Sequence, residues 1–283
     1  MWLGRDAEQD SALPRDWLDV LSREPRALPG ADDATDVPAA PDAPMSAALL
    51  DDWTREPRRY GLHATLKAPF RLAVGQSVVA LDAALRALAA STPPFTLALQ
   101  LRALRGFLAW QAAEPAIERG ALQALADRCV RELDLFRAPP TAQDRARRLE
   151  KAGGEAKVYD AREAAHLERW GYPYVFDTFR FHITLTNRLA SGEEAAARRV
   201  LAALARWVAT KDGASDRRDV ISGVAHGMPV RDISLFIQAA PDRPFVVARH
   251  YGFDGRVRDA AGAAALGEKA VDAGHRADKE IAE

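Results

Sequence analysis

The chain of 283 residues has little of several features that mark specialised classes of protein. Its one cysteine, Cys129, excludes an internal disulfide and with it a stapled extracellular scaffold. No run reaches the roughly 18 apolar residues that a membrane span needs, and charge follows closely after Met1. Lys and Arg number 39 against 40 Asp and Glu, so no overall positive field favours nucleic acid or anionic membrane. We therefore expect a cytoplasmic protein without membrane contact, in which any anion site is local.

The remaining composition is that of an ordinary globular protein. Hydrophobic residues make up 48% and charged residues 28%, and 18 Gly with 17 Pro are too few for a fibrous or wholly disordered chain. Cys129 lies in an apolar-periodic stretch, which favours a small buried hydrophobe over a nucleophile. The sequence contains neither a Gly-x-x-x-x-Gly-Lys loop nor a Gly-x-Ser-x-Gly elbow, so it supports neither a nucleoside triphosphatase nor a serine hydrolase.

Apolar periodicity and turn residues divide the chain into expected elements. Near the N-terminus we expect a loop over 28–44 and a short helix over 45–53, with Pro57 as its breaker. Further helices are expected at 78–90, 117–135, 160–170 and 192–208. Strands are expected at 60–66, 95–101, 107–111, 179–186, 219–226, 232–238 and 244–251. The polar stretch 137–155 is interpreted as a connection between lobes, and 256–283 as a disordered tail.

Two short segments repeat one pattern of residue types. Residues 62–67 (Leu-His-Ala-Thr-Leu-Lys) and 181–186 (Phe-His-Ile-Thr-Leu-Thr) both place Thr-Leu shortly after a His between apolar residues. Among six histidines, two such copies have a chance on the order of one in 2,000 at average residue frequencies. Because side chains alternate along a strand, each segment would present three polar side chains on one face. These are His63, Thr65 and Lys67 in the first segment and His182, Thr184 and Thr186 in the second.

These motifs resemble those of the 2H phosphoesterases, a family named for two His-x-Thr/Ser motifs on such strands. The closer similarity is to the bacterial DUF1045 branch, which is linked to phosphonate metabolism, through residues 57–70 and 179–186. It extends to 2–6, 107–109 and 233–236. The resemblance implies an α+β, bilobal fold in which two pseudo-symmetric lobes of antiparallel strands, with outer helices, surround a central cleft.

The resemblance also implies how the chain is divided. We expect a single domain over residues 1–255, with lobe one at about 54–136 and lobe two at about 175–253. Members of the branch begin with a further strand and turn before the equivalent of residues 2–6, whereas this sequence begins at Met1. We therefore expect an unpaired sheet edge beside the cleft.

The chemistry that the resemblance implies agrees with the residue types. Opening a cyclic phosphodiester needs a base for water and an acid for the leaving alkoxide, and two imidazoles supply both near neutral pH. His63 and His182 are the expected catalytic pair, although the sequence does not say which is the base. Thr65 and Thr184 would hold non-bridging phosphate oxygens. We expect a small-molecule substrate, either a ribose cyclic phosphate of phosphonate breakdown or a 2′,3′-cyclic nucleotide, and short RNA ends remain an alternative.

Five further residues are candidate substrate contacts. Lys67 and Thr186 would add phosphate contacts on the two strand faces, although for Lys67 an ordinary solvated lysine is the alternative. Arg59, Tyr60 and Arg180 flank the motifs and could contact a base, a sugar or a second phosphate. No cofactor is implied.

Two interpretations other than a metal-independent phosphodiesterase are compatible with paired histidines. A metal site is disfavoured because Asp177 is the nearest carboxylate to His182 and no Cys pair or His-Glu-x-x-His motif is present. The other is a binding module that holds a phosphorylated metabolite or nucleotide without converting it, which an incomplete first sheet would favour. The sequence gives no indication of oligomeric state.

Overall fold

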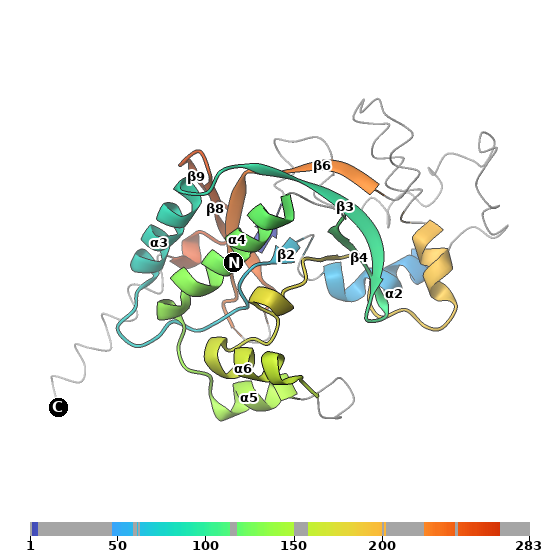
Figure 1. The fold of residues 1–283 in the computed structure, drawn as a ribbon, viewed down its shortest axis with the longest axis horizontal. Coiled ribbons are helices and arrows are strands. Elements are labelled where there is room, and N and C mark those ends of the chain that lie inside the picture. The colour runs from blue at the N-terminus through green and yellow to red at the C-terminus, as the bar shows by residue number, and fades with distance from the viewer. Residues whose placement is uncertain are drawn as a thin grey trace.

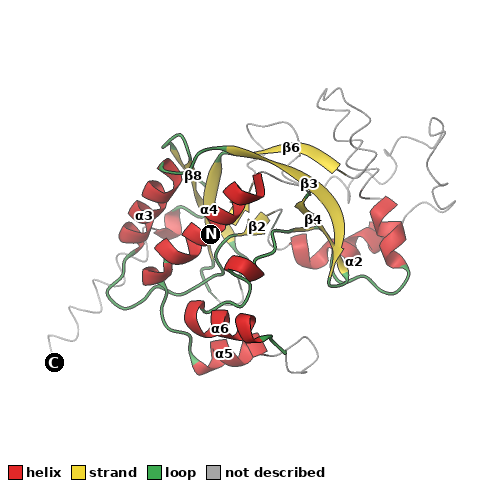
Figure 2. Cartoon of the chain, viewed as in Figure 1, coloured by secondary structure: helices red, strands yellow, loops and turns green. Residues whose placement is uncertain are grey.

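The computed structural model describes residues 2–4, 47–58, 61, 63–113, 118–149, 158–199, 201, 224–240 and 243–266. These residues form two antiparallel sheets with helices packed against them (Figures 1 and 2). The predicted α+β class and the antiparallel pairing are therefore confirmed.

The five-stranded sheet has the order β2-β1-β7-β8-β9. Its strands are β1 (Trp2–Gly4), β2 (His63–Thr65), β7 (Asp232–Ile237), β8 (Val246–Gly252) and β9 (Val257–Asp259). β1, which we expected to follow a missing strand, is itself an interior strand with Gly4 opposite His63 and Trp2 opposite both Thr65 and Ser234. The sheet edges are β2 and β9, and β9 extends the described sheet past residue 255, where we placed the end of the domain.

The four-stranded sheet has the order β5-β4-β3-β6. Its strands are β3 (Phe95–Leu104), β4 (Phe107–Ala112), β5 (Ile183–Thr184) and β6 (Val224–Val230). A two-residue turn at Arg105 and Gly106 joins β3 to β4, and both residues have positive φ angles, of 51° and 89°. Such turns match the twist of the strands they join, which is why glycine is favoured here. Figure 1 shows β3 and β6 curving along the length of this sheet.

Each sheet combines strands from both halves of the sequence, so the expected lobe limits of 54–136 and 175–253 do not match the sheets. β2, which carries the first motif, pairs through β1 with the late strands β7 to β9, whereas β5 of the second motif pairs with the early hairpin β3–β4. The sequence pattern identifies a strand but does not identify its partner, because pairing depends on contacts distant in sequence.

The described residues include five helices of eight or more residues; in Figure 1 α3 lies at the left, α2 at the right, and α5 and α6 below. They are α2 (Ala47–Arg58), α3 (Val78–Ala90), α4 (Glu118–Glu132), α5 (Ala142–Leu149) and α6 (Ala161–Trp170), and residues 193–199 are also helical. α5 lies within the stretch interpreted as a connection, and α2 continues through Pro57 instead of stopping before it. None of the helices in the described ranges is long and apolar enough to cross a membrane.

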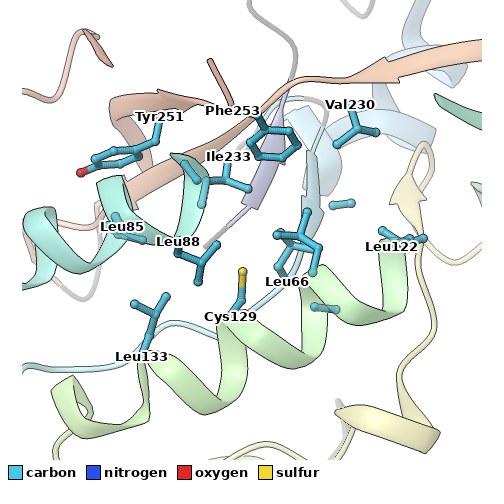
Figure 3. Packing of buried hydrophobic residues seen from close by; sticks show 14 of the residues in the cluster. Leu66, Leu85, Leu88, Leu122, Cys129, Leu133, Val230, Ile233, Tyr251 and Phe253 are labelled. Carbon is cyan, nitrogen blue, oxygen red and sulfur yellow. The ribbon is translucent and has the colours of Figure 1, made fainter. Parts of the chain in front are cut away.

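The main hydrophobic core joins both sheets to α3 and α4 (Figure 3). It includes Leu66 after β2, Leu97 on β3, Ile233 on β7 and Leu85 on α3. Cys129 is fully buried in it, and burial raises the pKa of its thiol to about 12, which confirms the prediction of a small buried hydrophobe. A smaller cluster lies between α2, the β3–β4 hairpin and residues 197–201. One shared core thus holds the two sheets in a fixed relation.

Candidate active site

The two histidine motifs meet where the sheets meet. β2 and β5 are edge strands of different sheets, and they lie against each other. The two imidazoles are close enough that His182 contributes electrostatically to the pKa of His63. Segments far apart in the sequence therefore form one candidate site.

The two rings are held by the same kind of hydrogen bond. The Nδ1 of His63 lies 2.9 Å from the carbonyl oxygen of Gly61, and the Nδ1 of His182 lies 2.7 Å from the carbonyl oxygen of Arg180. A carbonyl oxygen only accepts, so Nδ1 carries the proton in each ring and Nε2 is the nitrogen without one. Gly61 has a φ of 68°, a left-handed conformation that glycine adopts without strain.

A phenylalanine lies beside each histidine. The ring of Phe236 on β7 is tilted against His63, and the ring of Phe107 on β4 is tilted against His182, with centroids 6.1 Å apart in both pairs. Both lie in the segments 107–109 and 233–236 to which the resemblance extends, but the sequence analysis gave neither a role, because an aromatic in a strand pattern is by itself no signal of a site. Each imidazole therefore has an aromatic ring as a neighbour.

The surroundings of His63 favour its neutral form. Burial lowers the pKa of His63 from 6.5 to about 4, partly opposed by the Gly61 carbonyl and reinforced by the charge of His182. At pH 7 the ring is therefore neutral, with a lone pair on Nε2. A neutral imidazole can accept a proton from water at its unprotonated nitrogen.

Thr65 and Thr184 occupy equivalent places two residues after their histidines. Thr65 pairs with Trp2 across the five-stranded sheet, and Thr184 pairs with Ala109 across the four-stranded sheet. Both are half-buried. Within the described part of the chain neither hydroxyl makes a side-chain hydrogen bond, so both remain available as donors to an oxyanion.

The phosphate contact predicted for Lys67 is wrong. The side chain is 4% exposed, and its ammonium donates to the carbonyl oxygen of Val130 and pairs with Asp134 at 3.1 Å. Burial lowers the pKa of Lys67, whereas Asp134 opposes that effect. The physical reason is that β2 ends at Thr65 and the chain bends, so strand alternation does not extend to residue 67. Lys67 fixes the end of α4 to the first motif.

A cavity lies beside Lys67 and is not lined by either histidine. It is lined by Lys67, Ala68, Pro69, Val130, Arg137, Arg148, Trp170, Gly171, Tyr172 and Val175. The carboxylate of Asp134 neutralises part of the positive charge of the cavity lining, because it binds the Arg137 guanidinium at 2.8 Å as well as the Lys67 ammonium. We assign the cavity no part in the candidate site.

The phosphate contact predicted for Thr186 is wrong for a similar reason. β5 ends at Thr184, and Thr186 is 1% exposed. Its hydroxyl accepts the backbone N–H of Leu108 at 3.0 Å and donates to the carbonyl oxygen of Asn187 at 2.8 Å. Thr186 therefore prolongs the pairing of β4 with the second motif.

The flanking candidates have different outcomes. Arg59 and Tyr60 lie outside the described residues. Arg180 is exposed, and its guanidinium donates to the carbonyl oxygens of Asp177 and Phe179, at 3.2 and 2.9 Å. Arg180 thereby closes the short loop that leads into His182.

Asn187, which the sequence analysis did not identify, ties the second motif to the helix that precedes the first. Its side-chain amide donates to the carbonyl oxygen of Asp52 and accepts the N–H of Glu56, the two groups that pair in a regular helix. Its backbone N–H donates to the carbonyl oxygen of Trp53. Pro57 cannot supply an N–H to that carbonyl, so Asn187 replaces the hydrogen bond that the proline removes. This explains why α2 continues through Pro57.

Comparisons with known proteins place the chain in a family. Two curated proteins match, each called "Ribose 1,5-bisphosphate phosphokinase PhnN". The protein from Janthinobacterium sp. (strain Marseille) is 35% identical over 209 residues, which are 74% of this chain and 42% of that protein. The protein from Laribacter hongkongensis (strain HLHK9) is 33% identical over 250 residues, which are 88% of this chain and 46% of that protein.

The chain thus spans less than half the length of these relatives. No solved structure matches it. The model of the family described as "Protein of unknown function (DUF1045)" matches residues 65–246, which include His182 and all of the β3–β4 hairpin. The chain belongs to the DUF1045 family.

Proposed function

We propose that this chain is a phosphodiesterase that opens a small cyclic phosphodiester with His63 as general base and His182 as general acid. One observation carries the proposal: β2 and β5, from different sheets, lie against each other, and each motif histidine has its Nδ1 bonded to the carbonyl of the residue two positions earlier. A pair of imidazoles suits a reaction that takes up one proton and delivers another.

The lowered pKa of His63 supports the assignment of roles. His63 is neutral at pH 7, so its Nε2 accepts a proton from the attacking water. The water oxygen bonds to phosphorus, one ring P–O bond breaks, and protonated His182 delivers a proton to the leaving alkoxide. The reaction consumes one water and converts a cyclic diester to a monoester. Each histidine contributes about 10²- to 10⁴-fold to the rate.

Thr65 and Thr184 hold the non-bridging phosphate oxygens in this mechanism. Thr65 follows His63 by two residues within β2, and Thr184 on β5 follows by two residues His182, which directly precedes that strand. Donors from two sheets would contact the phosphate from two sides, so negative charge that builds on its oxygens is stabilised where it forms.

The names of the relatives favour a ribose phosphate as the substrate. Those proteins are named for ribose 1,5-bisphosphate. Hydrolysis of the P–O2 bond of a ribose 1,2-cyclic phosphate that carries a 5-phosphate gives that compound, so we propose this cyclic ester as the substrate. It agrees with the link to phosphonate metabolism that the sequence resemblance implies. We do not extend the kinase reaction to this chain, because its sequence has no Gly-x-x-x-x-Gly-Lys loop.

Phosphorus NMR of the reaction tests the proposal. Wild type, His63→Ala and His182→Ala would each be incubated in EDTA with the ribose 1,2-cyclic phosphate 5-phosphate and with a 2′,3′-cyclic nucleotide. We expect wild type to convert the ribose ester to the 1,5-bisphosphate and both variants to lose about 10²- to 10⁴-fold in rate. Binding by folded wild type without conversion would reject the phosphodiesterase and favour the binding module.

A further inference from the structure

The four-stranded sheet carries an arginine on the same face as the second motif. Across this sheet Arg102 on β3 pairs with Ala109 on β4, and Ala109 pairs with Thr184 on β5. Residues directly opposite each other in antiparallel strands point to the same face. Arg102, Ala109 and Thr184 therefore form one row, with the small alanine in the middle.

Burial along β3 supports this orientation. Leu97, Leu99 and Leu101 are buried against the hydrophobic clusters, whereas Gln100 is half-buried and Arg102 is exposed. The ring contact between Phe107 and His182 lies on the same side of the sheet as Ala109, because Phe107 is two residues before Ala109 on β4. We refer to this side, with Gln100, Arg102, Phe107, Ala109, His182 and Thr184, as the histidine face.

The guanidinium of Arg102 is oriented by a neutral group. Its Nε and Nη2 donate to Oε1 of Gln100, at 3.0 and 2.9 Å. In the described part of the chain no carboxylate forms an ion pair with Arg102, whereas Arg86 and Arg249 both pair with Asp82. The positive charge of Arg102 is thus fixed in direction but not neutralised, and its other N–H groups remain for an anion.

The spacing suits a second phosphate. Adjacent strands lie about 4.8 Å apart, so the backbones of Arg102 and Thr184 are separated by roughly 10 Å across β4. Only Ala109, with its small side chain, lies between Arg102 and Thr184 in this row, so a substrate that contacts both residues has to span about that distance. Arginine binds phosphate with two parallel hydrogen bonds, which gives direction as well as strength.

We propose that Arg102, held by Gln100, binds a terminal phosphate of the substrate distant from the ester that is hydrolysed. This inference rests on the proposed function and names the feature of the substrate that the site selects. A cyclic phosphodiester with a second phosphate is bound by Thr65 and Thr184 at the reacting end and by Arg102 at the other end. A cyclic ester without the second phosphate lacks the last contact.

A comparison of two substrates tests the proposal. We would measure kcat/KM for ribose 1,2-cyclic phosphate with and without a 5-phosphate. In wild type the ratio favours the phosphorylated substrate, and in Arg102→Gln it falls about 10- to 100-fold, the loss expected for a charge-assisted phosphate contact. Arg256→Gln is the matched control, because Arg256 is an exposed arginine paired with Asp254 in the turn between β8 and β9 of the other sheet. An unchanged ratio in Arg102→Gln would overturn the proposal.

Binding measurements separate this proposal from the proposed function. Calorimetry with ribose 1,5-bisphosphate and ribose 1-phosphate needs no turnover, so it remains decisive if neither cyclic ester is hydrolysed. We expect Arg102→Gln to weaken only the bisphosphate, and Arg102→Lys, which keeps the charge but loses the fork to Gln100, to have an intermediate effect. Equal affinities of wild type and Arg102→Gln for the bisphosphate would reject Arg102 as a phosphate site.

Discussion

The lowered pKa of His63 predicts that this one side chain makes folding sensitive to mild acid. The unfolded chain takes up a proton at this imidazole as the pH falls through 6.5, whereas the folded protein resists protonation until about pH 4. The unfolded state therefore binds more protons between these values, and the free energy of unfolding falls as the pH is lowered across this window. The full shift corresponds to about 3 kcal/mol, and solvent around the partly exposed ring reduces this figure.

The comparison protein is His63→Gln, which cannot take up the proton. Urea unfolding of wild type and variant, followed by tryptophan fluorescence at several pH values from 4 to 7.5, gives the difference in stability between them. Contributions of carboxylates are common to both and cancel. We expect wild type to lose about 2 kcal/mol relative to the variant between pH 7 and pH 4.5. His166→Gln controls for a histidine outside the site, and a constant difference between wild type and His63→Gln would refute the reasoning.

Three further predictions follow from other contacts. The acid side of the pH profile of kcat/KM reports the pKa of the base in the free enzyme, so its midpoint should lie near pH 4 and not near 6.5. A midpoint at 6.5 would show that the base is not His63. Lys67→Met should lower the free energy of unfolding by about 1–3 kcal/mol, since it removes the ion pair with Asp134, and should leave KM unchanged; a large rise in KM would restore Lys67 to the substrate site. Asn187→Ala should lower the free energy of unfolding by about 1–2 kcal/mol, because the two contacts of the amide with α2 are lost, and should reduce kcat. Thermal unfolding and steady-state kinetics measure these two effects. Unaltered stability would show that α2 does not depend on this amide.

Elements with local signals were predictable from the sequence. α3 occupies the expected 78–90, because Ser77 caps it and its apolar residues recur at helical spacing. The β3–β4 hairpin and its turn at Gly106 were likewise indicated by strand composition and a glycine between the strands. Both motif histidines were found because the pattern occurs twice.

Long-range features were not predictable in the same way. Which strands share a sheet depends on pairing between distant segments, so the lobe limits could not be obtained from hydrophobic alternation. The roles expected for Lys67 and Thr186 failed because alternation was extended past the ends of two short strands. Pro57 leaves the carbonyl of Trp53 without its usual helical partner, and Asn187 donates to that carbonyl instead. This contact has no local signature in the sequence, since Asn187 lies more than a hundred residues from α2.

The assignment of His63 as base and His182 as acid has one direct test. A cyclic phosphodiester with sulfur in place of the leaving oxygen expels a thiolate, which needs no general acid. We predict that His182→Ala hydrolyses this substrate within about tenfold of wild type but loses 10²- to 10⁴-fold with the oxygen substrate, whereas His63→Ala loses activity with both. If both variants are impaired equally with both substrates, or if neither is impaired, the two-histidine account is contradicted.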